Sequence, residues 1–182
     1  MRWLLGAALL GVALGAGALA YANAARHMAP AQPPAMAPAG EQADAITVHK
    51  AARRLVLLRN GVPIRSYAIS LGADPSGPKA REGDERTPEG TYVIDWRNAR
   101  SIAHLSLHIS YPNAADVAAA KAAGVSAGGD IMIHGLPNGW GAIGALHRLW
   151  DWTDGCIGLT NAEMSEVWSL VPDGTPITIY ND

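Results

Sequence analysis

The sequence predicts a mainly β domain with two short helices. Apolar and polar residues alternate over short segments from residue 45 onward, an Asn-Gly pair lies between two such segments, and the helical patterns are brief. Period-two alternation is typical of half-buried strands, and Asn-Gly is typical of a two-residue hairpin turn. We therefore divide the 182 residues into an apolar leader (1–24), a linker (25–44) and one folded domain (45–182).

The leader is an uncharged run, residues 3–22, that follows Met1-Arg2. It predicts either a signal peptide, for which Ala22-Asn23-Ala24 offers an A-x-A cleavage site, or an uncleaved membrane anchor. Both alternatives place the domain outside the cytoplasm, and membrane contact is expected only if the segment is retained. Residues 29–40, rich in Pro and Ala, predict a semi-rigid spacer.

The strands are expected in the following order. Ile46 and Val48 alternate with polar residues, an apolar run follows at 55–58, and Asn60-Gly61 turns the chain into residues 62–71. Strands are then predicted at 91–96 and 104–110, after a long Gly- and Pro-rich loop, 72–90, which we interpret as a lid over a cleft.

The chain after residue 110 is predicted to contain both helices and strands. Asn113 is a helix cap for residues 114–123, and IMIH, 131–134, is a short strand. A Gly-rich loop is expected over 135–144. Thr160 and Glu163 form the capping box of a second helix to about residue 170, and 175–180 is the last strand.

Cys156 is the only cysteine, so no internal disulfide forms, and in an exported chain it can only pair between molecules or remain a free thiol. A reactive thiol needs a nearby base, because an unassisted cysteine is largely protonated at neutral pH. His134 is the first candidate, since it ends a strand and Gly135 permits close approach. His147 shares the later loop and equally fits an apolar patch. The backbone amides of 154–156 are candidate oxyanion donors.

Other classes of function fit poorly. The net charge of −2, with Lys and Arg scattered, gives no basic surface for nucleic acid. One cysteine and dispersed histidines match no zinc spacing, so no metal is expected.

Three segments resemble the L,D-transpeptidase (YkuD-type) catalytic domain family, in its DWTxGCI-type branch. They are LGADPSGPKAREGDERTPEGTYVI (71–94), IMIHG (131–135) and DWTDGCIGLTNAEM (151–164), and the resemblance extends over 45–182. It implies a β-sandwich or barrel-like catalytic fold, an exported cell-wall enzyme and no cofactor.

The resemblance also implies a reaction. Cys156 would attack the amide after the third residue of a peptidoglycan stem, forming a thioester and expelling the terminal D-residue. An amine of a second stem, or of a wall-linked protein, would then resolve the acyl-enzyme. His134 matches the general base, and the Gly135 carbonyl orients it. Thr153 takes the usual Ser/Thr position, and the oxyanion hole would consist of the amides of Asp154, Gly155 and Cys156.

Two positions depart from the family pattern, because Asp154 and Gly158 stand where histidine and arginine are common. We hypothesise that another cation binds the substrate carboxylate: Arg148 first, or one of the loop cations Lys79, Arg81 and Arg86. Two alternatives to the transpeptidase remain. One is a cysteine amidase or L,D-carboxypeptidase that hydrolyses stems or wall-protein attachments. The other is an inactive peptidoglycan-binding module, which the presence of both Cys156 and His134 disfavours.

Overall fold

The structure, a computed structural model, describes residues 17, 20–21, 24 and 32–182. Most of the predicted leader, and with it the choice between signal peptide and anchor, lies outside these residues. Within them, no helix is both long and apolar enough to cross a membrane.

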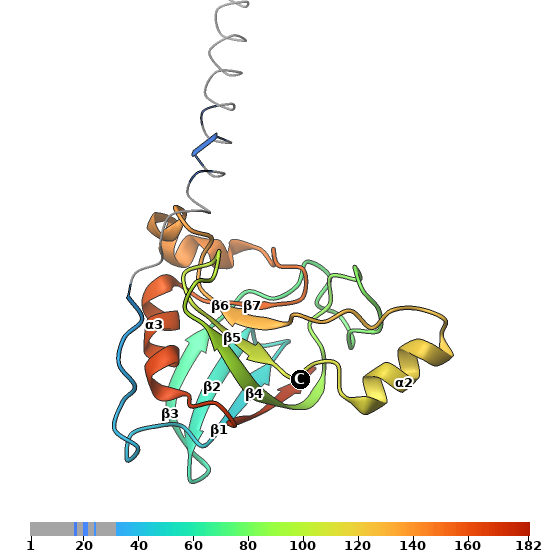
Figure 1. Cartoon of the computed structure of the whole chain (residues 1–182), viewed down its shortest axis with the longest axis horizontal. Helices are drawn as coiled ribbons and strands as arrows, with labels where there is room; N and C mark the ends of the chain where they lie inside the picture. Colours follow the sequence, from blue (N-terminus) through green and yellow to red (C-terminus); the bar gives the residue numbers. More distant parts are fainter. Residues whose placement is uncertain (1–16, 18–19, 22–23, 25–31) are drawn as a thin grey trace, which may run out of the picture.

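One curled sheet of eight strands forms the domain, in the order β3-β2-β1-β8-β4-β5-β6-β7 (Figure 1). Neighbouring strands are antiparallel except for the pairs β1/β8 and β6/β7, which are parallel. The strands are β1 (Ala45–His49), β2 (Arg54–Arg59), β3 (Val62–Ala68), β4 (Gly90–Asn98), β5 (Ser106–Ile109), β6 (Met132–His134), β7 (Ile157–Gly158) and β8 (Pro176–Tyr180).

The sheet nearly closes on itself beyond the end of β3. Ser70 pairs with Gly158 of β7, through backbone bonds of 3.0 and 2.8 Å, and Gly72 pairs with Thr153. The two ends of the strand order therefore meet at a seam, and the cysteine loop lies along it. The predicted mainly β, barrel-like fold is confirmed.

The hairpin between β2 and β3 turns at Asn60 and Gly61, whose φ angles are +50° and +73°. Positive φ at both central residues is the requirement of a type I′ turn, which explains the Asn-Gly pair. The predicted hairpin is confirmed.

Both predicted helices are present as α2 (Ala114–Ala122) and α3 (Asn161–Leu170), and each begins with a capping box, at Asn113 and Thr160. The expected Gly-rich loop over 135–144 is wrong in its second half, because a 3₁₀ helix, η1 (Gly141–Leu149), begins there. Non-helical backbone at Gly144 divides η1 into two pieces, each too short to give a helical periodicity in the sequence.

The core lies between the concave side of the sheet and α3. From α3 the buried side chains are Met164, Val167, Trp168 and Leu170. They join a continuous cluster that includes Leu107, Ile133, Ile157 and Ile177 of the sheet. Removing this apolar surface from water is the main stabilising contribution to such a fold.

The end of the predicted linker packs on the domain. The amides of Ala37 and Ala43 donate to the carbonyls of Ser169 and Leu170, each at 2.8 Å. Arg59 donates to two carbonyls of the same segment, and Ala43 is buried. Residues 37–43 therefore fasten the chain beside α3 before β1 begins.

The loop 72–90 is held by buried cations. Lys50, only 1% exposed, donates to the carbonyls of Gly77 and Thr87 and to the Glu89 carboxylate, at 2.6, 2.9 and 2.8 Å. Within the loop, Asp84 accepts from Lys79 at 2.8 Å and from three backbone amides. A loop with this many internal partners is a fixed wall, which disfavours our interpretation of it as a hinged lid.

Candidate active site

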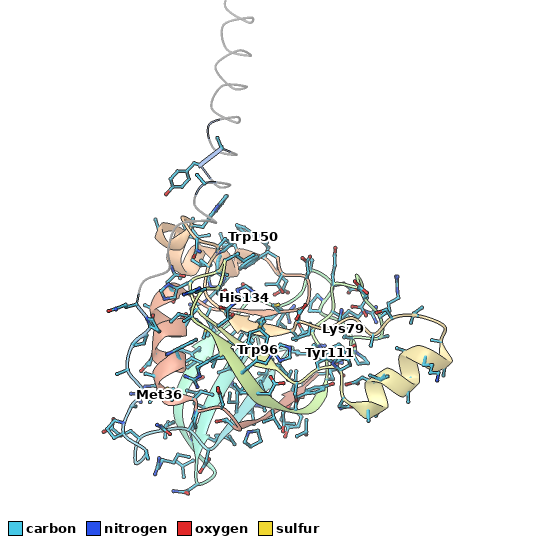
Figure 2. The ribbon with its side chains drawn as sticks, in the orientation of Figure 1. Met36, Lys79, Trp96, Tyr111, His134 and Trp150 are labelled. Carbon is cyan, nitrogen blue, oxygen red and sulfur yellow. The ribbon has the colours of Figure 1, made fainter. Side chains whose placement is uncertain are left out.

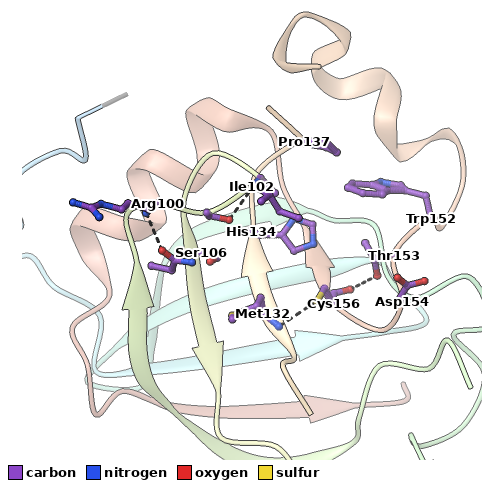
Figure 3. Close-up of a pocket in the computed structure, with 13 residues that line it drawn as sticks. Arg100, Ile102, Ser106, Met132, His134, Pro137, Trp152, Thr153, Asp154 and Cys156 are labelled. Atoms are coloured by element: carbon purple, nitrogen blue, oxygen red, sulfur yellow. Dashed lines mark hydrogen bonds between the residues drawn. The ribbon is translucent and has the colours of Figure 1, made fainter. Parts of the chain in front are cut away.

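Cys156 and His134 line the same pocket, of about 540 Å³, at the seam of the sheet (Figure 3). In Figure 2 the His134 label lies within the outline of the domain. The pocket is lined by Asn98, Arg100, Ser101, Ile102, Ala103, Ser106, Met132, His134, Pro137, Trp152, Thr153, Asp154 and Cys156.

The parallel pairing of β6 and β7 explains why these two side chains meet. Ile133 pairs with Ile157, and His134 with Gly158. Alternate residues of a strand point to one face, so Met132 and His134 share a face with Cys156 and Gly158. Ile133 and Ile157 point the other way, into the core.

Side-chain hydrogen bonds fix the turn that carries the cysteine. Asp151 accepts from the Leu71 amide at 2.9 Å and from Arg53 at 2.7 Å. Thr153 Oγ1 donates to the Cys156 carbonyl at 2.7 Å and accepts from the Gly155 amide at 3.3 Å. The turn is therefore restrained both by contacts with other segments and by hydrogen bonds within it.

Gly155 is required by close approach as well as by conformation. Its φ is +116°, and a Cβ at this position would lie 2.5 Å from the Arg86 carbonyl oxygen. The cysteine turn thus packs its backbone directly on the end of the 72–90 loop.

The resting thiol is neutral. The Met132 amide donates to Sγ at 3.3 Å, and Sγ donates to the Asp130 carbonyl at 3.6 Å. Burial raises the pKa of the Cys156 thiol, the Met132 amide opposes this, and the charge of Asp154 adds to it. Chemistry at this sulfur therefore needs a base to remove its proton.

His134 has the form that a base requires. Its Nδ1 lies 2.6 Å from the Gly135 carbonyl, which only accepts, so Nδ1 carries the proton and Nε2 is bare. Burial lowers the pKa of His134, and the bond to Gly135 opposes this in part. Among the described residues, no hydrogen bond joins His134 to Cys156; such contacts often tighten only when substrate is bound.

The three expected oxyanion donors differ in availability. The Gly155 amide is engaged by Thr153. In the described part of the chain, the amides of Asp154 and Cys156 have no hydrogen-bond partner. These two N–H groups are therefore free to donate to a ligand oxygen beside the thiol.

The cations named from the sequence lie away from this pocket. Arg148 forms an ion pair with Glu163, the capping residue of α3. Lys79 pairs with Asp84 and Arg86 with Asp74. Arg81, in the same 72–90 loop, borders a separate pocket with Asp84 and Arg86. None of the four lines the pocket that holds Cys156. Their role in binding a carboxylate stays a prediction.

The sequence reasoning missed several pocket residues. Arg100 is the one cation in the lining, and it belongs to the segment between β4 and β5, which no local sequence pattern marks as part of the pocket. Trp152 could have been predicted from the sequence, since it lies four residues before Cys156 in the segment 151–164 that resembles the family. Met132 follows from the alternation that also placed His134.

No three His, Cys, Asp or Glu side chains gather as a metal site in the part of the chain that the structure describes.

Comparison with known proteins gives one family and several similar folds. A family model for the L,D-transpeptidase catalytic domain (YkuD) matches residues 43–179. Bd1075 of Bdellovibrio bacteriovorus is similar in structure, with 25% identity, a TM-score of 0.55, and 84% of this chain and 53% of that one covered. No curated protein matches the chain.

Two further structures share the fold. Pgp2, a helical cell shape determining protein from Campylobacter jejuni, is 21% identical with a TM-score of 0.58, over 88% of this chain and 55% of that one. The LD transpeptidase LdtMt1 in complex with imipenem is 19% identical with a TM-score of 0.50, over 74% and 57%. The chain thus spans about half the length of these structures.

Proposed function

Because a family model matches most of its length, this chain belongs to the L,D-transpeptidase catalytic-domain family, and we propose that it is a cysteine-dependent acyltransferase acting on peptidoglycan stem peptides. The observation that carries the proposal is the shared pocket of Cys156 and His134, in which the Gly135 carbonyl fixes the histidine tautomer. A nucleophile, a bare ring nitrogen and two free amides then face one cavity.

In the first half-reaction, Nε2 of His134 takes the proton of the Cys156 thiol. The thiolate attacks the carbonyl carbon of the amide after the third stem residue, and the amides of Asp154 and Cys156 stabilise the oxyanion. The C–N bond then breaks, and His134 returns its proton to the departing amine. The products are a thioester on Cys156 and a free terminal D-residue.

In the second half-reaction an amine attacks the thioester. Neutral His134 accepts a proton from this amine, the C–S bond breaks, and Cys156 regains its proton. The amine of a second stem gives a cross-link, and that of a wall-linked protein gives an attachment. Water in the same place would make the enzyme a carboxypeptidase or amidase.

The raised pKa of Cys156 supports a base-dependent step rather than a preformed thiolate. A thiol with a permanently depressed pKa would react without His134. The neutral resting pair therefore makes the histidine indispensable in this proposal.

A stem-peptide substrate requires that the domain work in the periplasm or cell envelope. We propose that the uncharged segment 3–22 directs it there.

The test is to incubate the full chain with muropeptides bearing tetrapeptide stems and to follow both protein and products by mass. We expect a thioester adduct and cross-linked or exchanged stems, all lost in Cys156→Ala and His134→Gln. His108→Gln is the matched control, because His108 pairs with Asp95 and does not line the pocket. Shortened stems without exchange would identify the hydrolase, and no adduct on the wild type would refute the acyl-enzyme.

A further inference from the structure

The indole of Trp152 packs over Gly158, which has no side chain to fill that space. Gly158 pairs with His134 across β6 and β7, and a Cβ on Gly158 would lie 3.2 Å from Cζ2 of Trp152. The Trp152 and His134 rings meet edge to face, with centroids 5.6 Å apart and planes at 73°. Figure 3 shows both rings at the wall of the pocket that holds Cys156. Trp152 is thus the side chain packed against the proposed base.

A buried polar pair holds this indole in place. Trp152 Nε1 donates to Nδ1 of His147 at 3.4 Å, and His147 is only 1% exposed. Ser70 Oγ lies 3.0 Å from the same Nδ1 and 3.1 Å from the His147 carbonyl oxygen, and its one hydroxyl proton can be donated to either acceptor. Ser70 in turn pairs with Gly158 through the backbone. The tether therefore closes a ring of contacts around the seam.

The tether depends on the protonation of His147. Nδ1 accepts the indole N–H only when it is bare, so the neutral ring carries its proton on Nε2, which is buried without a partner among the described residues. Charges that act on this ring come from Arg148 and Glu163, which pair with each other. On the pocket side, the titratable groups are Cys156, Asp154 and His134 itself.

We propose that Trp152 is a positioning residue for His134, and that Ser70 and His147 are the tether that holds its indole against the imidazole. The inference rests on the proposed function for its kinetic consequence, but its structural content concerns only the state of His134. The indole does two things: it limits the ring to the orientation in which Nδ1 meets the Gly135 carbonyl, and it keeps water from the ring.

The second effect predicts a measurable change. Desolvation is the main cause that lowers the pKa of His134, so removal of the indole should admit water and raise that pKa toward the ordinary value of about 6.5. A residue that merely fills space in the fold would leave the titration of His134 unchanged.

The experiment compares Trp152→Leu with Trp150→Leu in the full chain. Trp150 lies two positions away, is 56% exposed and does not line the pocket, so it is the matched control (Figure 2). The first readout is titration of the His134 imidazole by NMR, and the second is the acid limb of kcat/KM for thioester formation. In Trp152→Leu we expect both to move to higher pH, and in Trp150→Leu neither.

The tether is tested at His147. His147→Leu removes the acceptor, and we expect kcat to fall about tenfold, the scale of one hydrogen bond, with little change in KM. His147→Asn places an amide oxygen near the position of Nδ1, so we expect it to restore most of the loss. If Trp152→Leu does not fold, this pair still decides the question.

Failure of each proposal has its own signature. If the wild type forms no thioester, the proposed function fails, while the NMR titration still tests the role of Trp152. An unchanged His134 titration in Trp152→Leu, or equal loss in His147→Leu and His147→Asn, would overturn the positioning role and leave the acyltransferase proposal intact.

Discussion

Replacing Gly155 by alanine should lower the free energy of unfolding and disturb the cysteine turn. The structure separates the loss of free energy into a backbone-conformation cost and a packing cost. The glycine has a φ of +116°, and an alanine Cβ would lie 2.5 Å from the Arg86 carbonyl oxygen. Forcing an alanine into such a backbone conformation costs about 1–3 kcal/mol. The clash with a backbone atom adds a packing cost of about 1–3 kcal/mol.

Gly174→Ala separates the two costs. Gly174 also has a positive φ, +90°, but nothing lies within 4 Å of its Cβ position, so this variant carries only the conformational cost. We expect urea denaturation to show a larger loss of unfolding free energy for Gly155→Ala, by about 1–3 kcal/mol. The rate of alkylation of Cys156 should change in Gly155→Ala, which displaces the cysteine turn, and should stay that of the wild type in Gly174→Ala. Equal losses in the two variants would refute the argument that the cysteine turn is packed on the 72–90 loop.

Three further predictions follow from the same contacts. Lys50→Met should lower the free energy of unfolding by about 3 kcal/mol, because it leaves the partly buried Glu89 carboxylate and two carbonyls without their donor, whereas exposed Lys121→Met should change it little. The acid limb of kcat/KM should lie below pH 6.5, since the base must be neutral and burial lowers the pKa of His134; a limb above that value would contradict this. Arg148→Ala should lower the free energy of unfolding by about 1 kcal/mol through the loss of its partially exposed pair with Glu163, and an unchanged KM would mean that Arg148 does not bind the substrate, whereas a raised KM would support that hypothesis.

The parts of the fold that could be predicted are those whose cause is local. The turn at Asn60-Gly61 and the capping box at Thr160 each depend on a few neighbouring residues, and both are present as expected. The 3₁₀ helix η1 depends instead on the burial of His147 beside Ser70, a contact between residues far apart in sequence. No local pattern records such a contact, so the segment was interpreted as a loop.

Some residues of the candidate site could likewise be predicted from local sequence features, and others could not. Strand alternation and a following glycine were enough to select His134, and composition was enough to select Cys156. The cation in the pocket lining could not be selected, because charge alone does not say which loop borders the pocket. Arg148 is closer in sequence to Cys156 but pairs with Glu163 of α3, whereas Arg100 belongs to the segment between β4 and β5.

Most of the side chains in residues 151–156 serve to hold the Cys156 sulfur in place. Asp151 binds Arg53 and the Leu71 amide, Trp152 reaches His147, and Thr153 closes the turn on the Cys156 carbonyl. The bonds of Asp151 and Trp152 restrain the turn relative to other segments, and the bond of Thr153 restrains it internally. A thiol with a raised pKa gains reactivity only while the bare nitrogen of its base stays within reach, and a small displacement removes that advantage. In the proposed reaction, the residues before the cysteine therefore act through geometry, without needing to touch the substrate.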